Sequence, residues 1–329
     1  MSKQWKYMIT SEYTEAQNKF NQYYEEKVLP ILQGIEKTRK RYFCTFMLII
    51  IALIMWLGYI IINLQDGIRG INKGNGFYGL VGCIIILILC WPMLSYYRRS
   101  KESLLPVLAN FFGNFSYIYN SELPLTLMEE SMLFRSKGQI RGEDCFTGMY
   151  QDVAVQIMEY HRFQQKQRYN EDYQRREKVY VSKDRGLIFY AEMNKQFKGK
   201  TIIVKDKGWF NIITKYKNLQ RVGLESPEFE KKFEVYSDNQ IEARYILTPV
   251  MLEYMEKLQE TFNQIEFSFF RQHILIKIET KKNTFECSNF FRSVINKKRI
   301  AQNFDELYLL FSIITTLRLN QKQVSINLN

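Results

Sequence analysis

Hydrophobic residues gather in two long uncharged runs in the first third of the chain, Phe43 to Ile62 and Phe77 to Tyr97. Each run approaches the roughly 20 residues that an α-helix needs to cross the hydrocarbon core of a bilayer. A buried helix of a soluble core is better matched by apolar runs of about 10 to 14 residues. The pattern therefore predicts a transmembrane hairpin over residues 43–97, with spans at 43–62 and 77–97.

Basic residues flank this hairpin at both outer ends, whereas the loop between the spans holds only Arg69 and Lys73 against Asp66. Cytoplasmic flanks of membrane spans carry an excess of Lys and Arg. Both termini are therefore predicted to be cytoplasmic, which makes the chain a multi-pass membrane protein. The flanking cations are Lys37, Arg39, Lys40, Arg41, Arg98, Arg99 and Lys101.

The segment before the first span, residues 1–42, contains an apolar stripe with three- and four-residue spacing. This spacing predicts an amphipathic helix from residue 11 to 42, kinked or split at Pro30. The stripe needs a covering surface, which is the chain's own body, a second copy, a partner protein or lipid. We treat it as a candidate partner surface made of Phe20, Tyr24, Val28, Leu32 and Ile35.

After the hairpin, residues 98–329 are expected to form a cytoplasmic body, either as one domain or as two subdomains dividing near residue 222. Helices are predicted at 103–115 and 124–134, and strand-like runs at 153–158, 178–182, 187–192 and 200–205 suggest an antiparallel meander. The polar insert between the first two strands, Arg162 to Lys178, contains few apolar residues and is predicted to be an exposed or disordered loop.

The last third of the chain contains both helix-like and strand-like hydrophobic periodicity. A short strand is expected at 233–236, capping residues at 237–239, and a helix after the Thr248-Pro249 pair. Alternating Ile and Phe residues predict a hairpin of 265–269 with 274–278, a third strand at 284–287, and an amphipathic closing helix around 307–317. The fold class predicted for the body is therefore α+β with antiparallel strands.

The net charge adds only a little to the predicted function. The 329 residues include 46 Lys plus Arg and 34 Asp plus Glu, a formal net charge of +12. A nucleic-acid-binding surface needs basic residues interleaved with aromatic ones on one face. Because the chain is predicted to sit in a membrane, attraction to anionic lipid is the preferred explanation, and no nucleic-acid partner is expected. The five cysteines include no C-x-x-C pair and are interpreted as small apolar residues or free thiols.

Several blocks resemble the bacterial family known as domain of unknown function 3137. The specific block is FEKKFEVYSDNQIEARYILTP, from Phe229 to Pro249. Weaker ones are FKGKT (197–201), GEDCFTG (142–148) and YYEEKVLPIL (23–32). The resemblance implies a bacterial inner-membrane protein with no established activity, catalytic residue or cofactor. It also implies that a LemA-like coiled-coil membrane protein is a candidate partner, beside self-association.

The sequence offers little chemistry. The stretch from Gly74 to Gly79 matches G-x-G-x-x-G, but no predicted strand precedes it, so a dinucleotide site is not expected. The two histidines lack Cys or carboxylate neighbours at metal-binding spacing. No catalytic, cofactor or metal-binding residue is predicted. The best polar cluster is Asp238, Glu242 and Arg244, for which helix capping and a local ion pair are a simpler explanation than catalysis.

These observations favour a membrane-anchored interaction or scaffold protein. One alternative is a membrane-tethered enzyme acting on lipid or envelope substrates, whose site would consist of residues distant in sequence. A second alternative is an oligomeric hairpin channel or a transporter accessory subunit, although neither span carries an ionisable residue to line a polar path.

Overall fold

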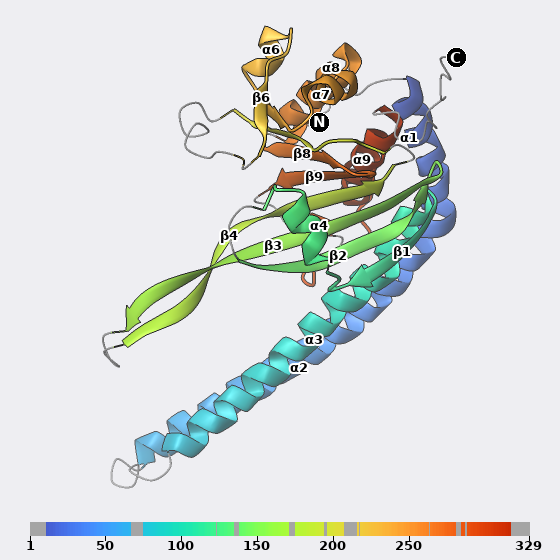
Figure 1. Ribbon diagram of the computed structural model, residues 1–329. Helices are drawn as coiled ribbons and strands as arrows, with labels where there is room; N and C mark the ends of the chain where they lie inside the picture. The colour runs from blue at the N-terminus through green and yellow to red at the C-terminus, as the bar shows by residue number, and fades with distance from the viewer. Residues whose placement is uncertain are drawn as a thin grey trace. The chain divides into compact units, whose positions relative to one another are not determined.

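Figure 1 shows the computed structural model of the chain. Side chains of the long helices are described up to Gly58 and from Trp91 onward. The structure describes residues 11–66, 75–122, 124–134, 138–170, 175–193, 196–206, 216, 218–262, 264–280, 284–286 and 288–316.

The amino-terminal helix runs without a break into the first predicted span. Helix α1 (Ser11–Tyr23) continues through a π-helical turn, η2 (Tyr24–Val28), into helix α2 (Leu29–Asp66). The helix is not split at Pro30, one of the two outcomes expected there, because α2 runs through this residue. A proline inside a helix lacks an N–H and crowds the carbonyl one turn back, and the wider π turn directly before it accommodates this locally.

Helix α3 (Asn75–Asn110) covers the second apolar run and contains Pro92 and Pro106. Among the described residues, one stretch, Tyr13–Gly58, is long and apolar enough to cross a membrane by length and composition. Most of the second predicted span, up to residue 90, lies outside the residues whose side chains are described.

The chain divides into two compact units. One consists of Phe20–Leu108 and Glu286–Gln302, and the other of Met1–Lys19, Ala109–Phe285 and Asn303–Asn329. A short segment from late in the chain thus belongs with the long helices, a division that local sequence patterns do not predict.

Specific hydrogen bonds hold that late segment in the first unit. The carboxylate of Glu36 accepts a hydrogen bond of 3.0 Å from the backbone N–H of Val294, and Arg39 donates to the carbonyl of Phe290 at 3.1 Å. The ring of Phe290 also contacts Phe43 and Phe46 at the start of the first apolar run, with centroid separations of 5.9 and 5.5 Å. The apolar run therefore begins against an aromatic cluster.

The described part of the second unit contains a nine-stranded sheet in which all neighbours are antiparallel. The spatial order is β1-β2-β3-β4-β9-β8-β5-β7-β6. The predicted antiparallel α+β body is confirmed. The strands are β1 (Asn114–Tyr119), β2 (Gln139–Tyr150), β3 (Val153–Asn170), β4 (Arg175–Glu192), β5 (Thr201–Lys205), β6 (Gln220–Val222), β7 (Phe233–Ser237), β8 (Ile265–Phe270) and β9 (His273–Glu279).

Both faces of the sheet are buried at its centre. Neighbouring residues on one strand point to opposite faces, yet Ile188 and Phe189 are both 0% exposed, as are Leu275 and Ile276. One face packs with Met128 of helix α4 (Leu125–Glu130). On the other face lie aromatic residues of helix α9 (Lys297–Thr316), where the Phe311 ring is 4.7 Å from Phe115 and 5.2 Å from Tyr150.

Several predicted elements are confirmed with small shifts. The hairpin of β8 and β9 pairs Ile265 with Ile278 and Phe269 with Ile274. Helix α8 (Pro249–Phe262) starts after Thr248, whose hydroxyl accepts a hydrogen bond from the N–H of Met251. Strands β6 and β7 pair with each other, so the segments on both sides of residue 222 share one sheet. The remaining helices are α6 (Pro227–Glu230) and α7 (Gln240–Ile246).

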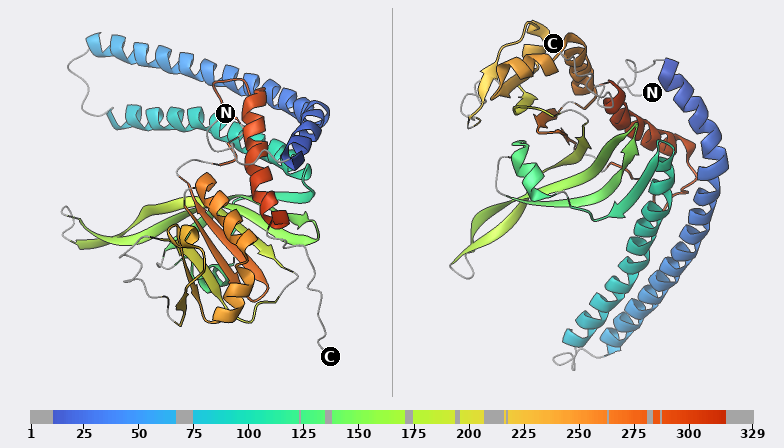
Figure 2. Two further views of the ribbon diagram at one scale, coloured as in Figure 1. Left: turned by 90° about the horizontal axis from the view of Figure 1, so that it is seen from above. Right: turned by 45° about the vertical axis from the view of Figure 1, so that its right-hand side comes forward.

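Three local predictions are wrong. Helix α3 ends at Asn110 and residues 114–119 form β1 instead of continuing the helix. Residues 284–286 are not a strand, and Cys287 lies outside the described residues. The insert from Arg162 to Lys178 is not a loop, because its described residues continue β3 and β4 as a paired ribbon that extends past the rest of the sheet (Figures 1 and 2). Its low apolar content did not indicate strands, because these residues only extend β3 and β4 beyond the parts of those strands that are buried.

Candidate functional site

Two of the three residues in the predicted polar cluster come together, and they hold a backbone loop. Glu242 accepts hydrogen bonds from the N–H groups of Lys198 at 2.8 Å and Gly199 at 2.6 Å. Asp238 accepts one from the N–H of Lys200 at 2.6 Å. The two carboxylates thus bind three consecutive backbone amides of the F-K-G-K-T block. These hydrogen bonds connect the F-K-G-K-T block with the Phe229 to Pro249 block, and both blocks carry the family resemblance.

The surrounding elements explain this arrangement. Strand β5 pairs with β7 from Thr201 opposite Ser237, so the residues before β5 pass beside those after β7. At Gly199 an added Cβ atom would lie 2.5 Å from the Asp238 carboxylate and 2.7 Å from the Cβ of Asn239. Glycine is therefore required for this close approach.

The predicted capping role of Asp238 is wrong by one position. The N-cap of helix α7 is Asn239, whose side chain accepts a hydrogen bond of 3.1 Å from the N–H of Glu242. Asp238 binds Lys200 instead. Arg244 lies on the exposed side of α7, and its guanidinium donates a long hydrogen bond of 3.5 Å to the carbonyl of Gly223. The predicted local ion pair with Arg244 is not among the ion pairs of the described residues.

This cluster is suited to fixing a loop. We expect Glu242→Ala to lower the free energy of unfolding by about 1–2 kcal/mol, because two backbone amides lose a charged acceptor. Glu242→Gln keeps one acceptor oxygen and is expected to lose about half as much. Chemical denaturation of the purified chain measures both. Equal stability of Glu242→Ala and the unsubstituted chain contradicts a loop-holding role.

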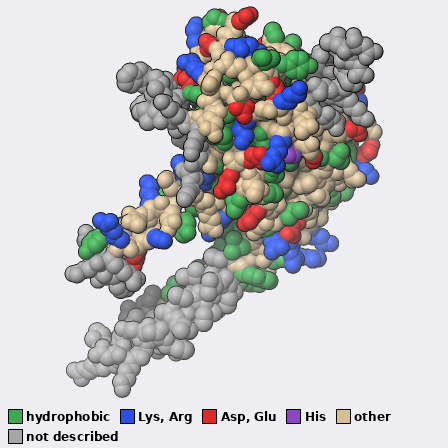
Figure 3. Space-filling model, in the orientation of Figure 1, with side chains coloured by type: hydrophobic (Ala, Val, Ile, Leu, Met, Phe, Trp, Pro, Cys, Tyr) green, Lys and Arg blue, Asp and Glu red, His purple; other side chains and the backbone are tan. Residues whose placement is uncertain are grey.

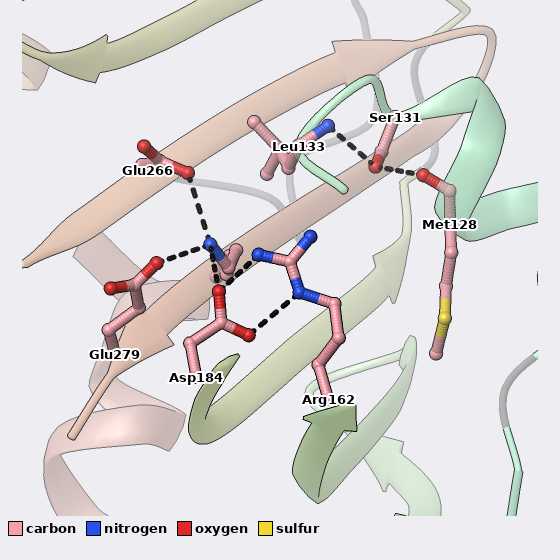
Figure 4. A network of polar contacts seen from close by, with 8 residues as sticks. Met128, Ser131, Leu133, Arg162, Asp184, Glu266 and Glu279 are labelled. Atoms are coloured by element: carbon pink, nitrogen blue, oxygen red, sulfur yellow. Dashed lines mark hydrogen bonds and ion pairs between the residues drawn. The ribbon is translucent and has the colours of Figure 1, made fainter. Parts of the chain in front are cut away.

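A second polar group, which sequence patterns did not reveal, lies on the central strands of the sheet near the end of the β4–β9 pairing, with its two cations buried (Figure 4). Arg162 on β3 and Asp184 on β4 form a two-point ion pair, with Nε and Oδ1 2.8 Å apart. Lys277 on β9 lies 3.7 Å from Asp184, 3.6 Å from Glu266 and 2.5 Å from Glu279. We call these five residues the buried charge network. The side chains of Arg162 and Lys277 are only 6% and 3% exposed.

Neighbouring side chains complete the surroundings of the two cations. The ring of Phe134 lies 5.7 Å from the Arg162 guanidinium carbon and 5.5 Å from the Lys277 nitrogen, within the range of cation–π attraction. Nearby, the Ser131 hydroxyl donates to the carbonyl of Met128 and accepts from the N–H of Leu133, which fixes the turn after α4. The network is thus enclosed by ordered structure on the α4 side.

The electrostatics of the network favour ionised partners. Burial raises the pKa of Asp184, but the hydrogen bond from Arg162 and the positive charge of Lys277 outweigh it, so the pKa lies below its ordinary value. Burial lowers the pKa of Arg162, but the hydrogen bond to Asp184 outweighs it and leaves the pKa above its ordinary value. Both groups therefore remain charged at neutral pH.

Tyr160 is a neighbour of this network. The residue is 0% exposed, and its hydroxyl has no hydrogen-bond partner among the described residues. Burial, followed by the negative charges of Asp184 and Glu279, raises its pKa well above the ordinary value. The phenol is thus a neutral group in this network.

The sequence signal for this network is weak because its members come from four strands, β3, β4, β8 and β9. Arg162 and Asp184 face each other in the β3–β4 register, next to a bulge at which β4 carries one extra residue. Lys277 sits on β9, far along the chain, and is brought in by the β4–β9 pairing. The charges of the network pair with one another across neighbouring strands and are enclosed, so they do not form an open binding or catalytic site. The described residues include no group of three His, Cys, Asp or Glu residues placed to hold a metal ion.

The residues of the predicted partner surface on the amino-terminal helix are all buried within the chain. Their exposed fractions lie between 0% and 7%, so in this structure they do not form a free surface. This matches docking of the helix onto the chain itself, one of the coverings open at the sequence level. The five are Phe20 at 3%, Tyr24 at 4%, Val28 at 0%, Leu32 at 0% and Ile35 at 7%.

The family model that matches the chain is described as "Protein of unknown function (DUF3137)" and covers residues 184–319. This match supports a DUF3137 assignment for that region. The matched region includes Asp184 and Lys277 of the buried charge network, and also Asp238 and Glu242, which bind the amides of residues 198–200. It confirms the family predicted from the Phe229 to Pro249 block.

No curated protein matches this chain. Among solved structures it is similar to the crystal structure of the mycobacterial trehalose monomycolate transport factor A, TtfA, at 13% sequence identity and a TM-score of 0.36. The likeness covers 67% of this chain and 96% of that one.

Proposed function

We propose that this DUF3137 protein is a membrane-anchored interaction protein, a scaffold held in a bacterial inner membrane. The observation that carries the proposal is the apolar stretch of α2. None of its side chains that the structure describes, up to Gly58, is buried within the chain. The core helix of a soluble protein would bury such a stretch, so its exposure supports contact with lipid.

The exposed apolar side chains are large and recur at three- and four-residue steps along one side of the helix. An uncovered stretch of this length exceeds the apolar patches that soluble monomers usually show. The large exposed residues are Met47 at 40%, Leu48 at 67%, Ile51 at 49%, Ile54 at 61%, Met55 at 67% and Leu57 at 45%.

We extend the proposal to a hairpin with α3 as the second span. Its residues 77–97 are uncharged, and Trp91 and Leu94 near their end are 65% and 64% exposed. Lys and Arg cluster at both outer ends of the pair, which supports cytoplasmic termini. The body then lies on the cytoplasmic side.

An exposed apolar pair on α7 supports the interaction role. Ile241 is 84% exposed and Tyr245 63% exposed, and residues four apart lie on the same side of a helix. Val250, at the start of α8, is 60% exposed. These residues belong to the family-matched region and are largely exposed. We infer that they contact a protein partner, with a coiled-coil membrane protein or a second copy as candidates.

Cysteine accessibility in cells tests the membrane proposal. Cys145 is buried and is a poor reporter, so we choose Asn72→Cys in the loop between the spans and Lys231→Cys on the exposed body. An impermeant maleimide is expected to label Asn72→Cys in spheroplasts and Lys231→Cys only after permeabilisation. Alkaline carbonate should leave both variants in the membrane fraction. Release by carbonate contradicts the anchor, and the opposite labelling pattern reverses the topology.

Photocrosslinking tests the interaction surface separately. A benzoylphenylalanine at Ile241 is expected to give a discrete adduct in membranes, and the same probe at exposed Lys231 serves as the matched control. Equal labelling patterns at the two positions contradict a specific contact on α7.

A further inference from the structure

The β3–β4 ribbon becomes an isolated two-stranded arm beyond the main sheet. Pairing of β2 with β3 ends at Gln139 opposite Phe163, and pairing of β4 with β9 ends at Gly186 opposite Glu279. From Gln164 to Asn170, each residue of β3 pairs only with β4 among the described residues. We call residues 164–170 and 175–181 the arm. At about 3.3 Å per residue it extends roughly 20 Å.

The register assigns the arm's side chains to two faces. Residues opposite each other in an antiparallel pair share a face, and alternate residues along a strand do so too. Tyr169 pairs with Arg176, Gln167 with Lys178, and Gln165 with Tyr180. One face of the arm therefore carries six residues, and each of them is exposed. We call this the basic face, made of Gln165, Gln167, Tyr169, Arg176, Lys178 and Tyr180.

The basic face lacks acidic residues and presents two aromatic rings. Tyr169 is 56% exposed and Tyr180 59% exposed, so neither ring is used to build a core. Glu177, the acidic residue on the described part of β4 in the arm, points to the opposite face by the same alternation. Figure 3 shows Lys and Arg side chains next to hydrophobic ones along the arm.

We propose that the basic face of the arm binds an anionic membrane surface. The two cations match lipid phosphates in charge, and tyrosine rings beside them favour the polar boundary of a bilayer, where one end of the ring is apolar and the other wet. The arm itself gains from such a contact, because an isolated two-stranded ribbon is marginally stable in water. The proposal rests on the membrane anchor of the proposed function, which keeps a bilayer within reach at high effective concentration.

Hydrogen exchange of the full chain in lipid nanodiscs tests the proposal. We compare discs of phosphatidylcholine with discs that contain phosphatidylglycerol, and follow peptides that cover the arm. Each cation near an anionic surface strengthens binding about fivefold, so the two together contribute roughly 30-fold. Amide exchange in the arm is expected to be at least about tenfold slower in the anionic discs.

Variants test whether Arg176 and Lys178 cause the lipid dependence of exchange in the arm. Arg176→Gln with Lys178→Gln should remove the lipid dependence, whereas Arg176→Lys with Lys178→Arg should retain it. Lys231→Gln with Lys257→Gln removes the same charge from exposed positions on the body and is expected to leave the lipid dependence unchanged. The conservative pair distinguishes loss of charge from local unfolding of the arm.

The outcomes separate this proposal from the membrane anchor. If the chain does not co-elute with discs of either lipid, the proposed function fails. If it co-elutes but exchange in the arm is the same in both lipids, the arm proposal alone is overturned. Protection of the arm by a single-stranded oligonucleotide, without an effect of phosphatidylglycerol, also overturns it, since aromatic and basic residues on one face serve nucleic acids equally well.

Discussion

Changing Val28 and Leu32 together to Asp is expected to unfold the unit that contains the long helices. Both side chains are 0% exposed. Burial of an unpaired carboxylate costs at least several kcal/mol, and two such costs approach the roughly 5–15 kcal/mol that stabilises an ordinary domain. Limited trypsin digestion in mild detergent should then cleave residues 20–108 rapidly.

A charge-matched control separates burial from charge. Asn21→Asp with Gln33→Asp adds two carboxylates at exposed positions of the same helix and should leave the trypsin pattern unchanged. If the double variant at 28 and 32 keeps its resistance to trypsin and loses a bound protein instead, the stripe is a partner surface after all.

Asp184→Asn is expected to lower the free energy of unfolding by about 3–5 kcal/mol, because it leaves two buried cations without their shared carboxylate. The Arg162 and Lys277 side chains are too enclosed to regain water. Tyr160→Phe, a change beside the same network, removes a hydroxyl that has no partner and is expected to cost less than about 1 kcal/mol. Chemical denaturation of the three proteins gives the comparison.

The unsubstituted chain and Asp184→Asn should also differ in how strongly acid lowers their free energies of unfolding. The folded pKa of Asp184 is lowered, so its contribution to stability is present above the unfolded pKa of about 3.9 and is lost as the pH falls through the lower folded value. The stability of the unsubstituted chain should therefore fall more steeply below about pH 4 than that of Asp184→Asn. Parallel pH profiles contradict an ionised Asp184 in the folded state.

Local sequence patterns predicted an element correctly where its structure depends on a few neighbouring residues. The alternation from Ile265 to Ile278 and the Thr248-Pro249 pair predicted β8, β9 and α8 closely, because side-chain period and capping chemistry act over a few residues. The stripe from Phe20 to Ile35 was likewise located correctly as an apolar face, although periodicity alone cannot say what covers it.

The rest depends on pairing between distant segments. The arm was predicted to be a loop because residues 162–178 are polar, and only the register inherited from the buried part of β3 and β4 makes them strands. The buried charge network was missed because Asp184 and Lys277 meet through the pairing of β4 with β9. For Asp238, the carboxylate was expected to bind its own helix, whereas the nearer donor in space is Lys200, placed by β5.

The hydrogen bond between Glu36 and Val294 also has a consequence for synthesis. The two residues are 258 positions apart. At about 5–20 residues per second, the ribosome needs roughly 13–50 s to travel from one to the other. During that interval the proposed first span can enter the membrane while the Glu36 carboxylate still lacks its partners from residues 286–302. Under the proposed function, insertion of the anchor thus precedes completion of the unit that contains Glu36, and a chain truncated before residue 286 is expected to reach the bilayer without finishing that unit.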